Sequence, residues 1–529
     1  MATGMGITMG KENEYSNHLM LSKTSQDKNN RIIKNTLMLY VRMFLIMLVS
    51  LYTSRVILQA LGIDDYGIYN VVGGLVSAFS ILTSSLSSVG ARFINFHLGK
   101  RDIDKVKKVV SNSINIQIYL SIIILIMCET IGLWFFYHKL NLPIERQQAA
   151  FWVYQLSIFT FVVKLLSVPY NALIIAHEKM SAYAYISILE VILQLGLVYC
   201  LLITSHDRLV IYVILMFSLS LAITILYYIY CKEKFEAYYY KLGLERSLFK
   251  EMVSYAGWNF IGLSSGILKN QGVDIIINIY FGVTINAARG ISSQVNNAVT
   301  KFSQNFMTAL NPQITQSYAA QEWDRFHFLI IQGARFSYYL MLIICLPIFI
   351  EMEYILSIWL PTVPPFTCIF AQLQIICSLI TVLSNTNITA MLATGKIRNY
   401  QIIVGLISLL NLPISLLCLH YGGFATITFY VAIVLEIICL ISRLIISKRL
   451  TRLSVRIFLN KVIGNVTVVT MFSLIIPIIL YINLPKNLIS FITIVITSIL
   501  TTILSIYIVG LDNNEKILIS KKFKLLLNK

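Results

Sequence analysis

Long apolar runs separated by short polar segments dominate the chain. A helix needs about 20 mainly apolar residues to cross the hydrocarbon core of a bilayer. About fourteen stretches of this length predict an all-α polytopic membrane protein, and the second and eighth are the least apolar. They cover residues 36–58, 66–91, 110–136, 148–174, 181–203, 209–231, 253–280, 284–311, 329–351, 366–394, 398–419, 423–446, 459–482 and 487–510.

The basic residues test this count, because Lys and Arg accumulate in the cytoplasmic loops of membrane proteins. Of the 42 Lys and Arg residues, 31 fall on the side of the two termini, 4 on the opposite side and 7 inside spans, where three at span ends (Arg398, Arg443 and Lys461) are counted with the adjoining loops. Dropping one span would scramble this alternation. We therefore predict a multi-pass protein of the bacterial inner (plasma) membrane with cytoplasmic N and C termini.

The composition argues against several classes of protein. Apolar residues make up 57% and charged residues 12% of the chain, whereas a soluble domain carries about a quarter charged residues. The net charge of +18 lies in short clusters between spans, which argues against nucleic-acid binding. The eight cysteines form no CxxC pair, and no nucleophile–base or metal-ligand spacing is present. We expect no enzyme, no metal and no cofactor.

A weak internal repeat divides the chain. At one constant offset Leu61-Gly62 falls on Phe281-Gly282 and Asp104-Lys105 on Asp324-Arg325, and at a slightly smaller offset 176–183 resembles 393–400. Six spans bring the chain back to the same side, so the repeat predicts two parallel six-helix lobes plus two extra C-terminal helices. The predicted boundaries are a cytoplasmic tail at 1–34, an N-lobe at 35–250, a C-lobe at 251–447, and two further helices with a basic tail at 448–529.

Seven basic residues lie inside spans, where charges are costly and usually functional. Two of them are Lys164 and Arg335. The other five belong to spans one, seven and eight: Arg42, Arg55, Lys269, Arg289 and Lys301. Together they predict a cationic cavity for an anion such as pyrophosphate, because one guanidinium group can donate two parallel hydrogen bonds to phosphate oxygens. The alternative for Arg42 and Arg55 is that both reach a membrane interface.

Polar residues share helix faces with these cations. Facing lipid they would be unsatisfied, so we expect them to line the cavity. The set comprises Asn270, Asn278, Ser293, Asn296 and Thr300. The alternative for span eight is a cytoplasmic amphipathic segment, which would invert every later loop.

Two in-span acids, Asp274 and Glu190, are candidates for coupling to a Na⁺ or H⁺ gradient. The alternative is that each is only an ion-pair partner. Asp274 and Lys269 are five positions apart, a poor spacing for a pair on one helix. We therefore expect Asp274 to meet a basic group on another helix.

The segment Leu61-Gly62-x-x-x-Tyr66-Gly67-Ile68-Tyr69 follows Ser54-Arg55 and precedes a Ser-rich second span. It resembles the polysaccharide-transporter, or O-antigen flippase (Wzx-like), branch of the multidrug/oligosaccharidyl-lipid/polysaccharide (MOP) exporter superfamily. The resemblance implies two lobes around a V-shaped cavity lined by helices one, two, seven and eight. It further implies that the rocking lobes flip a polyprenyl-pyrophosphate-linked oligosaccharide for O-antigen, lipopolysaccharide, capsule or a similar glycan.

Partners follow from this resemblance. They are the lipid-linked oligosaccharide and membrane lipids, with the glycan polymerase machinery as a candidate, and we expect a monomer. The main alternative is a cation-coupled multidrug or solute exporter of the same superfamily. An enzyme of glycan assembly is a third hypothesis, which the short outer loops disfavour.

Overall fold

The computed structural model describes residues 5–77, 80–139, 143–204, 207–241, 243, 245–360, 362–513 and 515–516. Within these ranges the chain forms helices and no β-strand, which confirms the all-α fold class. Side chains are described from Arg31 onward, with short gaps. The side chains of most of the predicted N-terminal tail, and the basic C-terminal tail beyond Lys516, therefore lie outside the described part.

Ten helices in the described part are long and apolar enough to cross a membrane, and a bent pair makes an eleventh. The bent pair joins α11 (Thr367–Val382) to α12 (Asn385–Thr394) at 42°. These eleven correspond to all predicted spans except the second, seventh and eighth. Those three are also helical, and they fall in α1 (Met5–Ser77), α2 (Ser80–Gly99) and α8 (Arg246–Ala319).

Two glycines bend the longest helices. Gly62 in α1 has φ 81° and ψ 173°, and Gly282 in α8 has φ 78° and ψ −174°. Only glycine adopts this backbone region readily. The sequence suggested separate spans here joined by loops. In the structure the two helices of each pair are separate, as predicted, and they meet at a single glycine of non-helical backbone with no longer loop between them.

The two kinks and two pairs of turns lie at positions that the predicted repeat relates to one another. Gly62 and Gly282 are equivalent positions in it. Arg101 and Gln321 are related by the same offset, and both have positive φ, at 56° and 60°. Glu178 and Gly395, related by the slightly smaller offset, have φ of 57° and 76°. Three pairs of unusual backbone conformations at nearly one spacing confirm a parallel internal repeat.

One compact unit comprises Met1–Val76, Ser121–Lys234 and Thr308–Leu310. It contains α1, the end of α3 (Ile103–Met127) from Ser121 onward, and four further helices. These are α4 (Leu133–Lys139), α5 (Gln147–Ala176), α6 (Met180–Ile203) and α7 (Arg208–Lys234). Within it α7 packs against both α5 and α6.

The other unit comprises Ser77–Leu120, Phe235–Met307 and Asn311–Lys529. Its centre is α9 (Trp323–Ile350), whose apolar window is 67% buried, the largest share among the ten apolar helices of the described part. The chain continues through α10 (Met352–Trp359), α11 and α12, α13 (Arg398–Leu409), α14 (Asn411–His420), α15 (Ile427–Thr451), α16 (Val455–Phe458), α17 (Asn465–Asn483) and α18 (Leu488–Ser505).

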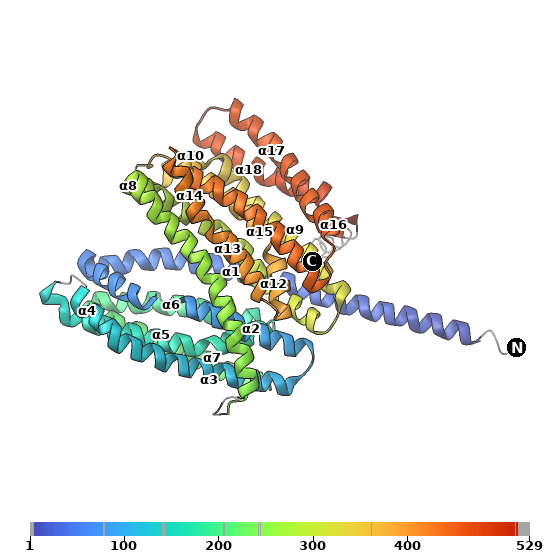
Figure 1. Ribbon diagram of the computed structural model, residues 1–529, viewed down its shortest axis with the longest axis horizontal. Coiled ribbons are helices and arrows are strands. Elements are labelled where there is room, and N and C mark those ends of the chain that lie inside the picture. Colours follow the sequence, from blue (N-terminus) through green and yellow to red (C-terminus); the bar gives the residue numbers. More distant parts are fainter. Residues whose placement is uncertain are drawn as a thin grey trace. The chain divides into compact units, whose positions relative to one another are not determined.

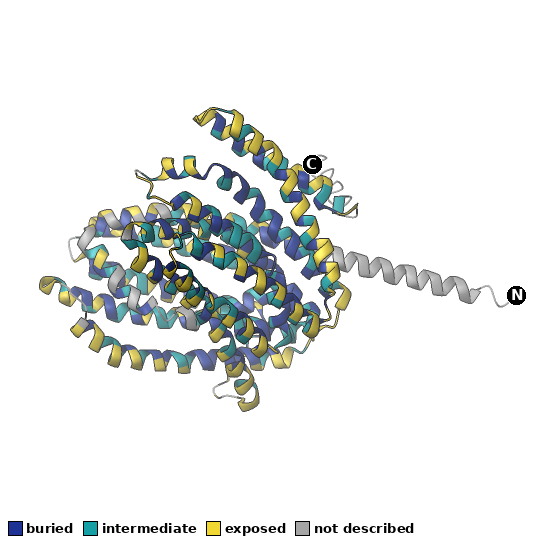
Figure 2. Ribbon diagram, turned by 45° about the horizontal axis from the view of Figure 1, so that its top comes forward, coloured by how far each residue is buried: buried dark blue, intermediate teal, exposed yellow. Residues whose placement is uncertain are grey.

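The two extra C-terminal helices pack on this centre. Helices α17 and α18 lie side by side (Figure 1), and both contact α9. Buried and exposed positions alternate along individual helices (Figure 2), as expected where one side meets protein and the other meets lipid or water. The lobe boundaries predicted from sequence stay a prediction.

Candidate functional site

In the first unit Arg42 on α1 faces α6. Its guanidinium lies 4.5 Å from the centre of the Tyr183 ring, and Nη2 donates to the Tyr183 hydroxyl at 3.4 Å. Ser187 is one turn further along α6 and lies 3.5 Å from the Tyr227 hydroxyl of α7. Glu190 comes next on that face, and both it and Arg42 are close enough to Tyr227 to act on it electrostatically. Helices α1, α6 and α7 thus gather one cation, one carboxylate and three hydroxyl groups.

Arg42 is half-buried, and its Nε is buried without a hydrogen-bond partner in the described part. Glu190 is also half-buried. Three other acids lie inside spans: Glu129, Asp274 and Glu436. Each of these has a hydrogen bond or ion pair, whereas Glu190 has neither among the described residues. Arg55 is exposed near the other end of the span, which fits a cavity or a membrane interface equally.

In the second unit Arg289 and Asp274 form an ion pair across the Gly282 kink, from Nε to Oδ1. Arg289 is only 8% exposed and its guanidinium lies 5.2 Å from the centre of the Phe429 ring. This confirms that Asp274 meets a basic group from another predicted span. It also means that part of the charge of Arg289 is already compensated, as the ion-pair alternative for Asp274 supposed.

The predicted polar face of span eight makes a seam with α11. Ser293 accepts a hydrogen bond from Gln374 at 3.4 Å, and Asn296 accepts one from Ser378 at 2.7 Å. Thr300 donates to the carbonyl of Asn297 within its own helix, at 3.3 Å. These groups hold two helices together, so their predicted role in lining a cavity competes with packing.

The exposed polar face of α8 lies elsewhere. Asn270 and Asn278 are exposed one turn either side of Asp274, and Lys301 is exposed further along. Lys269 is half-buried and lies within electrostatic reach of Cys377 and Cys439. Exposed polar groups on a membrane helix avoid lipid and seek water or protein. No contact joins Lys269, Arg289 and Lys301 to one another in the described part.

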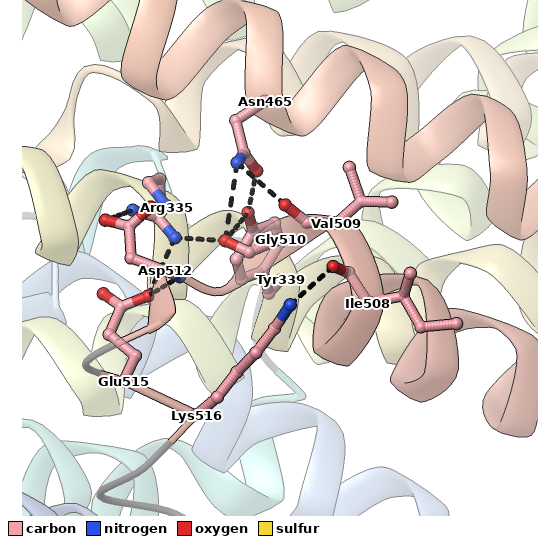
Figure 3. Close-up of polar contacts among 9 residues, drawn as sticks. All are labelled: Arg335, Tyr339, Asn465, Ile508, Val509, Gly510, Asp512, Glu515 and Lys516. Carbon is pink, nitrogen blue, oxygen red and sulfur yellow. Dashed lines mark hydrogen bonds and ion pairs between the residues drawn. The ribbon is translucent and has the colours of Figure 1, made fainter.

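Arg335 on α9 is a structural residue. It is 1% exposed and binds the chain that follows α18 (Figure 3). Its Nη1 lies 3.4 Å from Asp512, and its Nη2 lies 3.1 Å from Glu515 and donates to the Gly510 carbonyl. The sequence left this charge unexplained, because its partners lie far along the chain, beyond the last predicted span.

Two basic residues at span ends, both counted above with the loop charges, are buried in helices. Arg443 lies inside α15 and pairs with Glu436 at 2.6 Å. Arg92 lies inside α2, between the rings of Phe93 and Phe96 at 4.5 and 4.7 Å. Hydropathy alone does not show that a charge at a span end has a buried partner.

The sequence also missed a contact between α2 and the end of α8. Gln316 donates to Asn95 at 3.2 Å, and a Cβ on Gly99 would lie 2.8 Å from the Cβ of Ala319. Gly99 and Ala319 are related by the same offset as the two kink glycines, and Asn95 and Gln316 by an offset one position longer. Residues that meet their own repeat equivalents lie on the pseudo-two-fold axis. The contact lies next to the turns at Arg101 and Gln321, and all four residues belong to the second compact unit.

A second cluster of polar contacts holds the part of α1 around its kink in the first unit. Arg146 pairs with Asp65, and with Asp207 at 2.7 Å, and Arg208 donates to the Ala60 carbonyl at 3.2 Å. Burial raises the pKa of Asp207. The hydrogen bond and charge of Arg146, together with the backbone N–H groups of residues 209 and 210, outweigh burial and leave the pKa below its usual value.

No protein-family model matches the sequence, and no curated protein matches it. Solved structures do. An outward-facing multidrug resistance MATE family transporter of the MOP superfamily has a TM-score of 0.69 at 11% identity, over 80% of this chain and 96% of that one. A MOP superfamily transporter from Pyrococcus furiosus gives 0.66 at 11%, over 79% and 96%. The MATE transporter ClbM in complex with Rb⁺ gives 0.65 at 14%, over 81% and 96%. The chain therefore has the fold of the MATE transporters of the MOP superfamily.

Proposed function

We propose that this protein is an exporter, not an enzyme, and that it flips a polyprenyl-pyrophosphate-linked oligosaccharide across the bacterial inner membrane by alternating access of its two lobes. The supporting observation is a surplus of uncompensated positive charge on α1 and α8. Among the described residues, Arg42, Arg55, Lys269 and Lys301 have no carboxylate partner. In-span cations without counter-charges suit an anionic head group.

The fold supports the exporter part of the proposal, and the charges support the substrate. The structural neighbour from Pyrococcus furiosus is described as having a binding pocket of reversed polarity that suggests a different function. Members of this fold therefore differ in pocket charge. A cationic interior here fits a pyrophosphate better than a cationic drug.

Complementation tests the proposal. Lys269→Ala and Lys301→Ala should abolish surface glycan in a bacterium that lacks its own lipid-linked oligosaccharide flippase, at normal membrane levels of the protein. Lys164→Ala is the matched control, because Lys164 is an exposed in-span cation on α5, outside the candidate residues. Wild-type glycan in both cavity variants would contradict the cationic-cavity argument.

One observation favours the second candidate, a cation-coupled multidrug or solute exporter. Glu190 is an in-span carboxylate without an ion-pair partner in the described part, and such a group can carry a proton or sodium ion. A neighbour of the same fold is described in complex with Rb⁺. Raised drug tolerance that is lost in Glu190→Gln, with no effect on surface glycan, would support this candidate over the first.

A further inference from the structure

A cavity of about 480 Å³ lies outside the candidate residues, within the second unit. Its walls come from the first turns of α8, from the turn between α12 and α13, and from Phe93 of α2. The positive-inside rule places these loops on the predicted cytoplasmic side. The volume lies within the range of roughly 300–1,000 Å³ that is usual for small-molecule sites.

The polar lining is mostly cationic. Lys250, Lys396 and Arg398 line the cavity with one carboxylate, Glu251, so the ionisable side chains carry a net charge of +2. All three basic side chains are exposed, and none has an ion-pair partner among the described residues. Ammonium, guanidinium and hydroxyl groups all donate hydrogen bonds to phosphate oxygens.

Aromatic and hydroxyl groups complete the walls. Trp258 lies beneath Arg398, with the guanidinium 5.1 Å from its ring centre. This stacking orients the Arg398 fork while leaving its edge free for an anion. Ser247 and Ser254 add hydroxyl donors to the lining.

The equivalent turn in the N-terminal half is built differently. At the equivalent place in the N-terminal half, Glu178 occupies the position of Gly395, and Arg31 that of Glu251. There Glu178 is buried and its carboxylate lies 3.6 Å from Arg31. Where one half closes the turn with an ion pair, the other leaves an open space with three cations.

Gly395 allows Arg92 to approach this turn closely. Glu178 shows that a residue other than glycine tolerates positive φ at this turn. However, a Cβ at Gly395 would lie 2.5 Å from Nη2 of Arg92. Arg92 supports the turn from behind, donating to the Ala393 carbonyl at 3.2 Å, and its Nη1 lies 3.9 Å from Glu251. The one acidic group of the cavity is thus partly compensated by a buried guanidinium.

We infer that this cavity binds a phosphate or pyrophosphate group on the predicted cytoplasmic side, held by Lys250, Lys396 and Arg398 against the Trp258 wall. The anion is carried either by a membrane lipid or by a soluble compound. The inference depends on the proposed function only for the lipid source. In that case the lipid-linked pyrophosphate would bind here, on the predicted cytoplasmic side, before it is flipped.

The test is a titration of the full-length protein in phosphatidylcholine nanodiscs with inorganic pyrophosphate, followed by tryptophan fluorescence. We expect a saturable change that is absent in Trp258→Phe. Lys396→Ala and Arg398→Ala should each weaken binding by about tenfold, since a hydrogen bond to a charged group contributes on the order of that factor. Lys179→Ala, the repeat equivalent of Lys396 at the closed turn, should bind as the wild type does.

A second arm separates the two sources. Nanodiscs that contain a polyprenyl pyrophosphate should weaken the response to soluble pyrophosphate if the ligand is a lipid head group, and leave it unchanged if the ligand is soluble. The absence of any Trp258-dependent signal, or unchanged affinity in both Lys396→Ala and Arg398→Ala, would overturn the site. Neither result bears on glycan export by the Lys269 and Lys301 variants, so the two proposals fail separately.

Discussion

Gly62 and Gly282, equivalent positions of the internal repeat, adopt the same glycine-only backbone conformation and bend α1 and α8 at corresponding points. An added Cβ would meet nothing within 4 Å at either position. Any effect of a side chain there must therefore come from the backbone angles and not from a clash. The repeat is thus preserved in the feature that joins the first two spans of each half.

Replacing either glycine by alanine should destabilise the protein by about 1–3 kcal/mol, because the backbone would be strained or the kink lost. Thermal unfolding of the purified protein measures this. Gly67→Ala and Gly290→Ala are the controls, because they are also free of neighbours within 4 Å but have ordinary helical angles. Both should be neutral or stabilising. Equal losses in all four variants would contradict the explanation by backbone strain.

The Arg289–Asp274 pair allows a double-mutant cycle. Asp274→Asn leaves a mostly buried guanidinium without its counter-ion, so it should lower the unfolding temperature more than the double variant Asp274→Asn/Arg289→Gln does. If Arg289 also binds substrate, as the sequence predicted, the double variant should regain stability without regaining glycan export. If the double variant recovered both stability and glycan export, Arg289 would serve only as the ion-pair partner of Asp274.

The contact of Gly99 with α8 should be sensitive to one methyl group. A Cβ at Gly99 would lie 2.5 Å from the Gln316 carbonyl oxygen. Gly99→Ala should therefore force α2 and the end of α8 apart and, under the proposed function, reduce export several-fold, while the membrane level stays normal. Gly290→Ala serves again as the control. Full export by Gly99→Ala would show that this close approach is not needed in the transport cycle.

The lowered pKa of Asp207 predicts a pH dependence. A carboxylate whose pKa is lower in the folded state stabilises the fold above its unfolded pKa, and this contribution is lost as pH falls through the folded value. Asp207→Asn should thus lower the unfolding temperature at pH 7, and the gap from the wild type should close under acid conditions. A gap that is independent of pH would show that charge is not the cause.

Apolar run length was enough to predict most membrane helices, because bilayer thickness sets that length. Loop charge and the weak repeat then gave the parallel halves, which Gly62 and Gly282 confirm. The ion pair of Asp274 was predictable from its spacing to Lys269, which left another helix as the only good partner. These results depend on local sequence or on one dominant physical constraint.

The pairing of polar groups was not predictable in the same way. Ser293 and Asn296 face α11 and not open space, because helix rotation is set by packing that no local pattern reports. Arg92 looked like a loop charge, and the cavity beside Gly395 depends on a turn that only the folded chain brings near α8. One signal could have pointed to this cavity: the repeat has a glutamate, Glu178, in one half and a glycine, Gly395, at the equivalent position of the other.

Arg335 should hold the last two helices to α9. Removing a buried cation from its carboxylates typically costs about 3–5 kcal/mol. The value here should fall toward the lower end, because Asp512 is 56% exposed. We expect Arg335→Ala to lower the unfolding temperature, and Arg335→Lys to recover only part of it, since an ammonium cannot reach Asp512, Glu515 and the Gly510 carbonyl together. Arg456→Ala, an exposed arginine on α16, is the control. Identical melting of Arg335→Ala and Arg456→Ala would mean that α17 and α18 are held by apolar packing alone.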